Sequence, residues 1–106
     1  MRPKRYLGEL AGQKEKIKQR AQDINEIQTR LKNTKKNLHL LEKRIAISED
    51  LLKSELTTQY KHLSLLREGT KLRSRAEEDA IALKRARSAL REARKTSLQI
   101  CIPESR

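Results

Sequence analysis

A seven-residue repeat is the feature that most limits what this chain can fold into. Large aliphatic side chains occupy one position of the repeat over six intervals without a miss: Leu10, Ile17, Ile24, Leu31, Leu38, Ile45 and Leu52. The companion positions, three residues further along, are mixed: Gln13, Arg20, Ile27, Thr34, Leu41, Ser48 and Glu55. A period of seven held this long is typical of a left-handed coiled coil rather than of a wide apolar face buried in a globule.

The residues between Gln13 and Arg67 include neither proline nor glycine, which predicts one long coiled-coil helix over residues 13–68 after a basic segment 1–12. Beyond Leu52 the apolar spacing slips by two four-residue steps, which is interpreted as a stutter within the same seam. The predicted seam is Leu10, Ile17, Ile24, Ile27, Leu31, Leu38, Leu41, Ile45, Leu52, Leu56, Leu63 and Leu66.

A second, shorter helix is expected after Gly69, because glycine often follows a helix end. Ser74 and Glu77 have the spacing of a capping box, so the predicted turn is 69–73, the second helix 74–98 and the tail 99–106. The second helix has its own apolar stripe: Leu83, Ala86, Leu90, Ala93 and Ser97. The fold class is therefore all-α, a long coiled-coil helix followed by a shorter one. Two arrangements remain open, an uneven helical hairpin, which is favoured, and an extended rod paired with other chains.

The composition agrees with a coiled coil. Hydrophobic residues make up 35% of the 106 residues and charged residues 38%, and the only aromatic residues are Tyr6 and Tyr60. A small globule normally fills its core with aromatic side chains. In either arrangement a single chain is expected to leave part of the long stripe uncovered, so other protein chains are expected on the coiled-coil seam.

The net charge of +12 is concentrated toward both ends of the chain. Residues 1–36 hold 11 lysine and arginine residues against 4 acidic ones, and residues 71–106 hold 10 against 5, whereas residues 37–70 are neutral. A chain of this kind attracts acidic partners. An acidic protein surface or polymer is favoured, and nucleic acid is possible.

Within this charge pattern, six basic residues between positions 84 and 95 are accompanied by one acid, Glu92. The predicted acidic-partner site is Lys84, Arg85, Arg87, Arg91, Arg94 and Lys95. On helical spacing four of them form a stripe beside the apolar one, and a merely solvated face would mix charges of both signs. The apolar residues Ile100, Cys101 and Ile102 are a second candidate, a short docking peg, although an extension of the last helix contact is the favoured interpretation.

Signals for catalysis are lacking in the sequence. His39 and His62 have no ligand-spaced neighbours, and there is no phosphate loop or nucleophile motif, so we expect no enzyme activity, no cofactor and no metal. A single cysteine favours a reducing compartment. With no signal-peptide or membrane-span pattern, the expected location is intracellular, in the cytoplasm or on the cytoskeleton, with the nucleus possible. No contact with membranes or small molecules is expected.

Three hypotheses for function follow. The leading one is a non-enzymatic coiled-coil structural or scaffolding protein that assembles with other chains and docks its basic ends on an acidic polymer or large complex. The alternative is a nucleic-acid-binding accessory protein that dimerises through the coiled coil and uses its basic helix on phosphates. The third is a regulatory adaptor that recruits or inhibits one enzyme.

Overall fold

The chain consists of two long helices joined by a short connection. The computed structural model describes residues 3–101, and the side chains of residues 5–99. Helix α1 is Pro3–Lys53 and helix α2 is Gln59–Cys101, which confirms the predicted all-α class. Neither described helix has both the length and the apolar composition that a membrane crossing requires.

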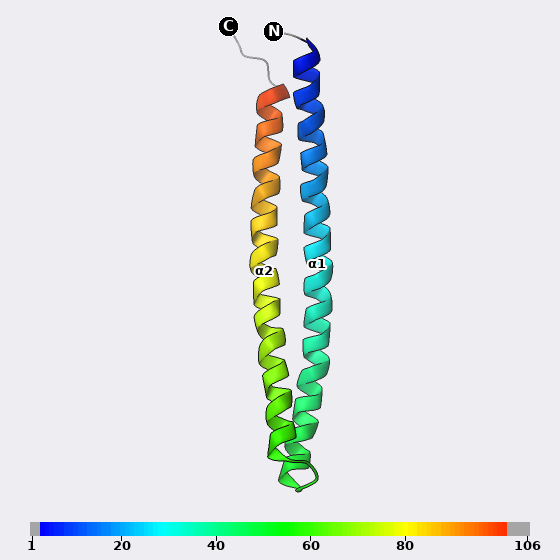
Figure 1. Cartoon of the computed structure of the whole chain (residues 1–106), viewed down its shortest axis with the longest axis vertical. Helices are drawn as coiled ribbons and strands as arrows, with labels where there is room; N and C mark the ends of the chain where they lie inside the picture. The colour runs from blue at the N-terminus through cyan, green and yellow to red at the C-terminus, as the bar shows by residue number, and fades with distance from the viewer. Residues whose placement is uncertain (1–2, 102–106) are drawn as a thin grey trace. The chain divides into compact units, whose positions relative to one another are not determined.

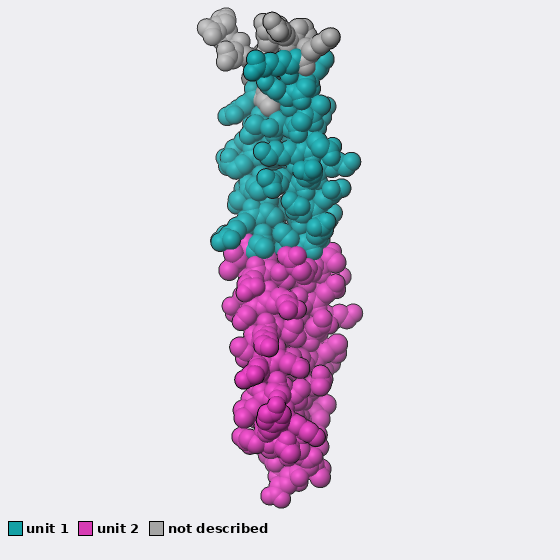
Figure 2. Space-filling model, in the orientation of Figure 1, with its two compact units in different colours: residues 1–27, 82–106 teal, residues 28–81 magenta. Residues whose placement is uncertain are grey.

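The fold divides into two compact units, which are coloured separately in Figure 2. Unit 1 comprises residues 1–27 and 82–106, and unit 2 comprises residues 28–81. In each unit a segment of α1 and a segment of α2 lie side by side and run in opposite directions (Figure 1). Unit 2 contains the connection, so it is by itself a helical hairpin.

The turn of unit 2 lies at residues 54–58. Glu55 adopts the left-handed conformation, with φ of 59°. The amide of Leu56 donates to the carbonyl of Leu51 (2.8 Å) and the amide of Glu55 to that of Leu52 (3.1 Å), the two bonds of a Schellman motif that ends a helix. Thr58 then caps α2, since its hydroxyl accepts from the amide of Lys61 at 3.2 Å.

The predicted domain boundaries therefore differ from those of the structure. Helix α1 begins within the segment 1–12 and ends at Lys53 rather than near residue 68, and the turn is not at 69–73. Helix α2 begins well before Ser74 and extends to Cys101. Gly69 lies inside α2 with no positive φ. It is buried, and a Cβ atom added to it would lie 3.2 Å from Cδ1 of Ile45. The glycine therefore marks a close approach of two helices rather than a helix end.

Unit 2 is held together by a seam with three-and-four spacing on both of its helical segments. On α1 the buried and half-buried positions are Leu31, Thr34, Leu38, Leu41, Ile45, Ser48 and Leu52. On α2 they are His62, Leu65, Gly69, Leu72, Ala76 and Asp79. This spacing matches the seven-residue repeat, because a helix turns nearly twice in seven residues.

Unit 1 has a seam of the same period with smaller residues on its α2 segment. The α1 side is formed by Leu10, Gln13, Ile17, Arg20, Ile24 and Ile27. The α2 side is formed by Leu83, Ala86, Leu90, Ala93 and Ser97, the stripe predicted for the second helix. Small residues bury less apolar area, so each layer contributes less to stability than a leucine layer.

Three residues assigned to the seam lie outside it. Leu56 is 73% exposed, Leu63 53% and Leu66 37%. The prediction treated their shifted spacing as a stutter within one helix, whereas the chain turns at residues 54–58 and α2 starts a new register. In that register Leu65 and Leu72 face the seam, and Leu63 and Leu66 point outward.

Candidate interaction surfaces

A buried polar pair links the two helices of unit 2 near the turn. Oγ of Ser48 lies 3.0 Å from Nδ1 of His62, and both residues are more than nine-tenths buried. A serine hydroxyl can donate or accept, so the bond forms with either tautomer of the imidazole. In the sequence, Ser48 is one of the mixed companion positions of the seven-residue repeat. In the described residues, no three His, Cys, Asp or Glu side chains converge in a way that could hold a metal ion.

A second polar contact crosses unit 2 at its other end. Nε of Arg30 donates to Oδ1 of Asp79 at 2.9 Å, and the Asp79 side chain is only 9% exposed. The second carboxylate oxygen, Oδ2, is buried and has no protein partner. A buried charge is tolerated only opposite its partner, so the pair favours one register of the hairpin over its neighbours.

The part of unit 2 nearest the turn carries an exposed apolar surface, which we call the loop-end surface. It is formed by Ile47, Leu51 and Leu56. One side of it is hollowed into a groove of about 410 Å³, lined by Arg44, Ile47, Ser48, Leu51, Thr57, Lys61, Ser64 and Leu65. The groove thus has a largely apolar lining that also includes two cationic residues.

The groove also shows which helix positions share a face. If the seam positions are labelled a and d, with Ile45 and Ser48 on α1 and His62 and Leu65 on α2, then Leu51 and Lys61 both occupy position g, and both line the groove. In an antiparallel pair the g positions of the two helices therefore flank one side of the seam and the e positions the other.

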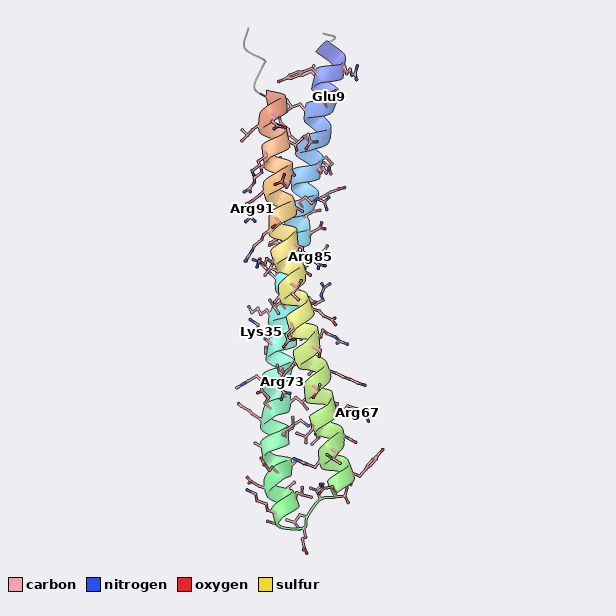
Figure 3. All side chains as sticks on the ribbon, turned by 90° about the vertical axis from the view of Figure 1, so that its left-hand side faces the viewer. Glu9, Lys35, Arg67, Arg73, Arg85 and Arg91 are labelled. Atoms are coloured by element: carbon pink, nitrogen blue, oxygen red, sulfur yellow. The ribbon has the colours of Figure 1, made fainter. Side chains whose placement is uncertain are left out.

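In unit 1 the side formed by positions e and b, which we call the basic face, carries cations of one sign. These are Lys14 and Lys18 from α1 and Lys84, Arg87, Arg91 and Arg94 from α2. All six are exposed, and no acidic residue of the described chain occupies an e or b position of this unit. Figure 3 shows Arg91 and Arg85 directed to different sides of α2.

The opposite side of unit 1, formed by positions g and c, mixes both signs. Its cations are Arg5, Lys16 and Arg85, and its acids are Glu9, Asp23, Glu26 and Glu92. Each ion pair described in unit 1 uses an acid of this mixed face. Arg5 pairs with Glu9 (3.6 Å) and Lys95 with Glu92 (3.8 Å), and Arg20 of the seam pairs with Asp23 (3.8 Å). In residues 5–99, none of the six basic-face cations lies within 4.0 Å of an acidic oxygen.

The basic face is unfavourable for the isolated hairpin. Neighbouring cations three or four residues apart on a helix destabilise it by about 0.2–0.5 kcal/mol per pair. Lys14 and Lys18 form one such pair, and the four α2 cations form a continuous row of them. A face that only met solvent would lose nothing by including acids. The uniform sign is therefore not explained by the stability of the hairpin itself.

The structure sorts the predicted basic site into two groups. Lys84, Arg87, Arg91 and Arg94 share the basic face, whereas Arg85 and Lys95 do not. Arg85 belongs to the mixed face, and Lys95 lies on the outer side of α2 and pairs with Glu92. The predicted docking peg lies outside the described side chains, and its last residue, Ile102, outside the described backbone.

Sequence reasoning missed the contribution of α1 to the basic face. Lys14 and Lys18 are four residues apart, so their common face was visible in the sequence, but only the antiparallel register joins them to the α2 row. The groove of unit 2 was missed for the same reason, since it needs the turn to be at residues 54–58.

Comparison with known proteins agrees with the architecture. No curated protein and no solved structure matches the sequence. One family model matches residues 1–101, and its description is AprE, long alpha-helical hairpin. A helical hairpin of this kind is suited to protein interaction, because its outward positions are free to carry recognition residues. With nearly the whole chain matched, the protein belongs to the AprE family of long alpha-helical hairpins.

Proposed function

We propose that this protein works without catalysis, as a helical scaffold that joins other protein chains through its outward surfaces. The sequence suggested that other chains would cover the seam. Since α2 occupies the seam of α1 within each unit, we assign the contacts with other chains to the exposed positions instead.

The observation that carries the proposal is the loop-end surface of unit 2. Exposed apolar side chains scattered singly are ordinary, whereas a contiguous group marks an interaction site. Here Ile47 and Leu51, 59% and 38% exposed, line the groove, and Leu56, 73% exposed, lies in the turn that follows. Removing such a surface from water favours association.

The chemistry of the groove defines its partner. Arg44 and Lys61 are among the residues that line this largely apolar groove. The partner is therefore a protein segment with apolar side chains that enter the groove and acidic residues beside them, such as the end of another helical pair. The basic face of unit 1 is a second contact for acidic partners, in keeping with a scaffold that bridges components.

A photo-crosslinking experiment tests this function. A photoreactive amino acid at Ser64, an exposed position that lines the groove, should join the protein to a defined partner in extracts of its source cells. The same residue at Ser74, exposed on unit 2 away from the groove, is the control for position.

Two double variants supply the control for chemistry. I47S/L51S removes two apolar side chains of the groove lining and should abolish the crosslink, whereas L7S/L98S removes two exposed leucines of unit 1 and should leave it intact. Equal crosslinking in both variants, or none at Ser64 in the unaltered protein, would reject the loop-end surface as the site of contact.

A further inference from the structure

We propose that the basic face of unit 1 binds an acidic α-helix of a different protein, laid lengthwise along the α1 and α2 segments. The proposal rests on the proposed function, a protein-interaction hairpin, and names the chemistry of one partner. It concerns the six cations of the basic face and is independent of the groove in unit 2.

The first argument is the spacing of the cations. Lys84, Arg87, Arg91 and Arg94 follow one another at intervals of three, four and three residues. At a rise of 1.5 Å per residue these intervals are about 4.5, 6 and 4.5 Å. A neighbouring helix with glutamate or aspartate at three-and-four spacing has the same intervals, so each cation meets one carboxylate along the whole contact.

The second argument is the continuation of the row. Four residues after Arg94 the stripe reaches Leu98, which is 60% exposed, and on α1 the corresponding end of the face carries the exposed Leu7. An acidic stripe followed by an apolar residue at the same spacing is what an amphipathic helix supplies. On either side of Lys14 and Lys18 the face holds the small residues Ala11 and Ala21, which let a third helix approach closely.

Two other occupants fit the face less well. The phosphates of one DNA strand advance about 3.4 Å along the duplex axis and wind around it, whereas the cations of unit 1 lie along two nearly straight segments. An anionic membrane would be anchored by aromatic residues at its interface, and the basic face of the described chain includes none.

A second copy of this chain does not supply the acidic helix. On the mixed face of unit 1 acids alternate with Arg5, Lys16 and Arg85. In unit 2 the e and b positions hold three acids, Glu42, Glu49 and Glu77, among four cations. No described face carries acids alone, so the partner is a different protein.

The test uses the full chain and a synthetic helical peptide about four heptads long, with glutamate at three-and-four spacing and a leucine at the end of the stripe. A second peptide of identical composition has its glutamates distributed around the helix. Fluorescence anisotropy at near-physiological salt should show that the striped peptide binds at least about tenfold more tightly than the scrambled one, because only the stripe matches the row of cations.

Two charge-matched variants locate the binding. R87Q/R91Q/R94Q removes three cations of the basic face and should weaken striped-peptide binding by about tenfold or more. R5Q/K16Q/R85Q removes three cations from the mixed face, with the same change in net charge, and should change it by less than about twofold. Removal of like-charge neighbours leaves the helices at least as stable, so circular dichroism should show unchanged helicity in the first variant.

Four results would overturn the proposal. They are equal affinity for the two peptides, equal loss in the two variants, no measurable binding of the striped peptide, and tighter binding of a 20-base-pair DNA duplex or of anionic vesicles that is lost in R87Q/R91Q/R94Q. The last result would assign the face to phosphate. None of them bears on the crosslink at Ser64, so failure here is distinguishable from failure of the proposed function.

Discussion

The two units use the same helix-pair construction and differ in where their polar groups lie. In unit 2 polar side chains enter the seam and bond across it, through Ser48 with His62 and through Arg30 with Asp79. Its e and b face balances four cations against three acids. In unit 1 no such bond crosses the described seam, and the corresponding face carries six cations and no acid.

This difference indicates that polar residues have different effects in the two units. Polar contacts inside a seam stabilise little but reject other registers, so unit 2 determines how the hairpin pairs. Uniform charge outside a seam stabilises nothing in the isolated chain, which is why we propose a partner for the basic face of unit 1. If this comparison is correct, substitutions in the seam of unit 2 should alter folding, and substitutions on the basic face of unit 1 should alter binding alone.

The largest effect is expected from a charge in the apolar part of the unit 2 seam. Leu41 is 5% exposed, whereas its neighbour Leu40 is 53% exposed. Leu41→Asp buries an unpaired carboxylate and removes a leucine, so it should lower the free energy of unfolding by more than about 3 kcal/mol. Leu40→Asp should change it by less than about 0.5 kcal/mol. Urea denaturation followed by circular dichroism measures both, and similar losses would contradict the seam.

A smaller effect is expected at the buried charge pair. Arg30→Met leaves the Asp79 carboxylate buried without its partner and should cost about 1–3 kcal/mol, less than for a fully buried pair, because the Arg30 side chain is 56% exposed. Adding Asp79→Leu should restore stability to the original value or above it, since a leucine fits an apolar seam. Lys36→Met, at an exposed position of the same helix, is the control. Failure of the second substitution to rescue the first would mean that the two residues are not coupled.

A similar loss of stability is expected when the Ser48–His62 pair near the turn is broken. Ser48→Ala leaves Nδ1 of the buried His62 without its partner and should lower the free energy of unfolding by about 1–2 kcal/mol. Ser64→Ala removes an exposed hydroxyl from the facing helix and should have almost no effect. Thermal unfolding compares the two variants directly. A Ser48→Ala protein as stable as the unaltered protein would show that the hydrogen bond to His62 does not stabilise the fold.

The smallest effect is expected at Gly69. An alanine there gains about 1 kcal/mol of helix propensity, and its Cβ atom would meet Cδ1 of Ile45 at 3.2 Å, a flexible methyl group that can move by a few tenths of an ångström. Gly69→Ala should therefore be neutral or mildly stabilising, within about 1 kcal/mol. A turn at Gly69 would instead make alanine clearly destabilising, so the sign of the change in urea midpoint distinguishes the two.

The seven-residue periodicity made the helix interfaces predictable, whereas the residues around the turn did not reveal where α1 ends. The repeat from Leu10 to Leu52 and the stripe from Leu83 to Ser97 both lie at helix interfaces, because a seven-residue period has one geometric meaning. The helix end at Lys53 gave no comparable signal. Its left-handed residue is Glu55 rather than glycine, and nothing local to the sequence marks a glutamate for that conformation.

The misplaced turn explains the other errors. The turn was predicted at Gly69 because glycine often follows a helix end. In the structure Gly69 instead permits the close approach of Ile45. With the turn misplaced, Leu63 and Leu66 fell on the seam, and the cations of α1 and α2 could not be assigned to one face. The α2 row itself was predictable, since it depends on spacing within a single helix.

The pairing of α1 with α2 around residues 54–58 is the central claim, because the groove and the basic face both depend on it. Oxidative crosslinking of S48C/H62C in a C101S background tests it most directly, since the two side chains are in contact across the seam. We predict rapid formation of an intramolecular disulfide in the monomer, and little in S48C/L63C, where Leu63 points outward. Absence of the first crosslink, or its appearance only in covalent dimers, would contradict the account.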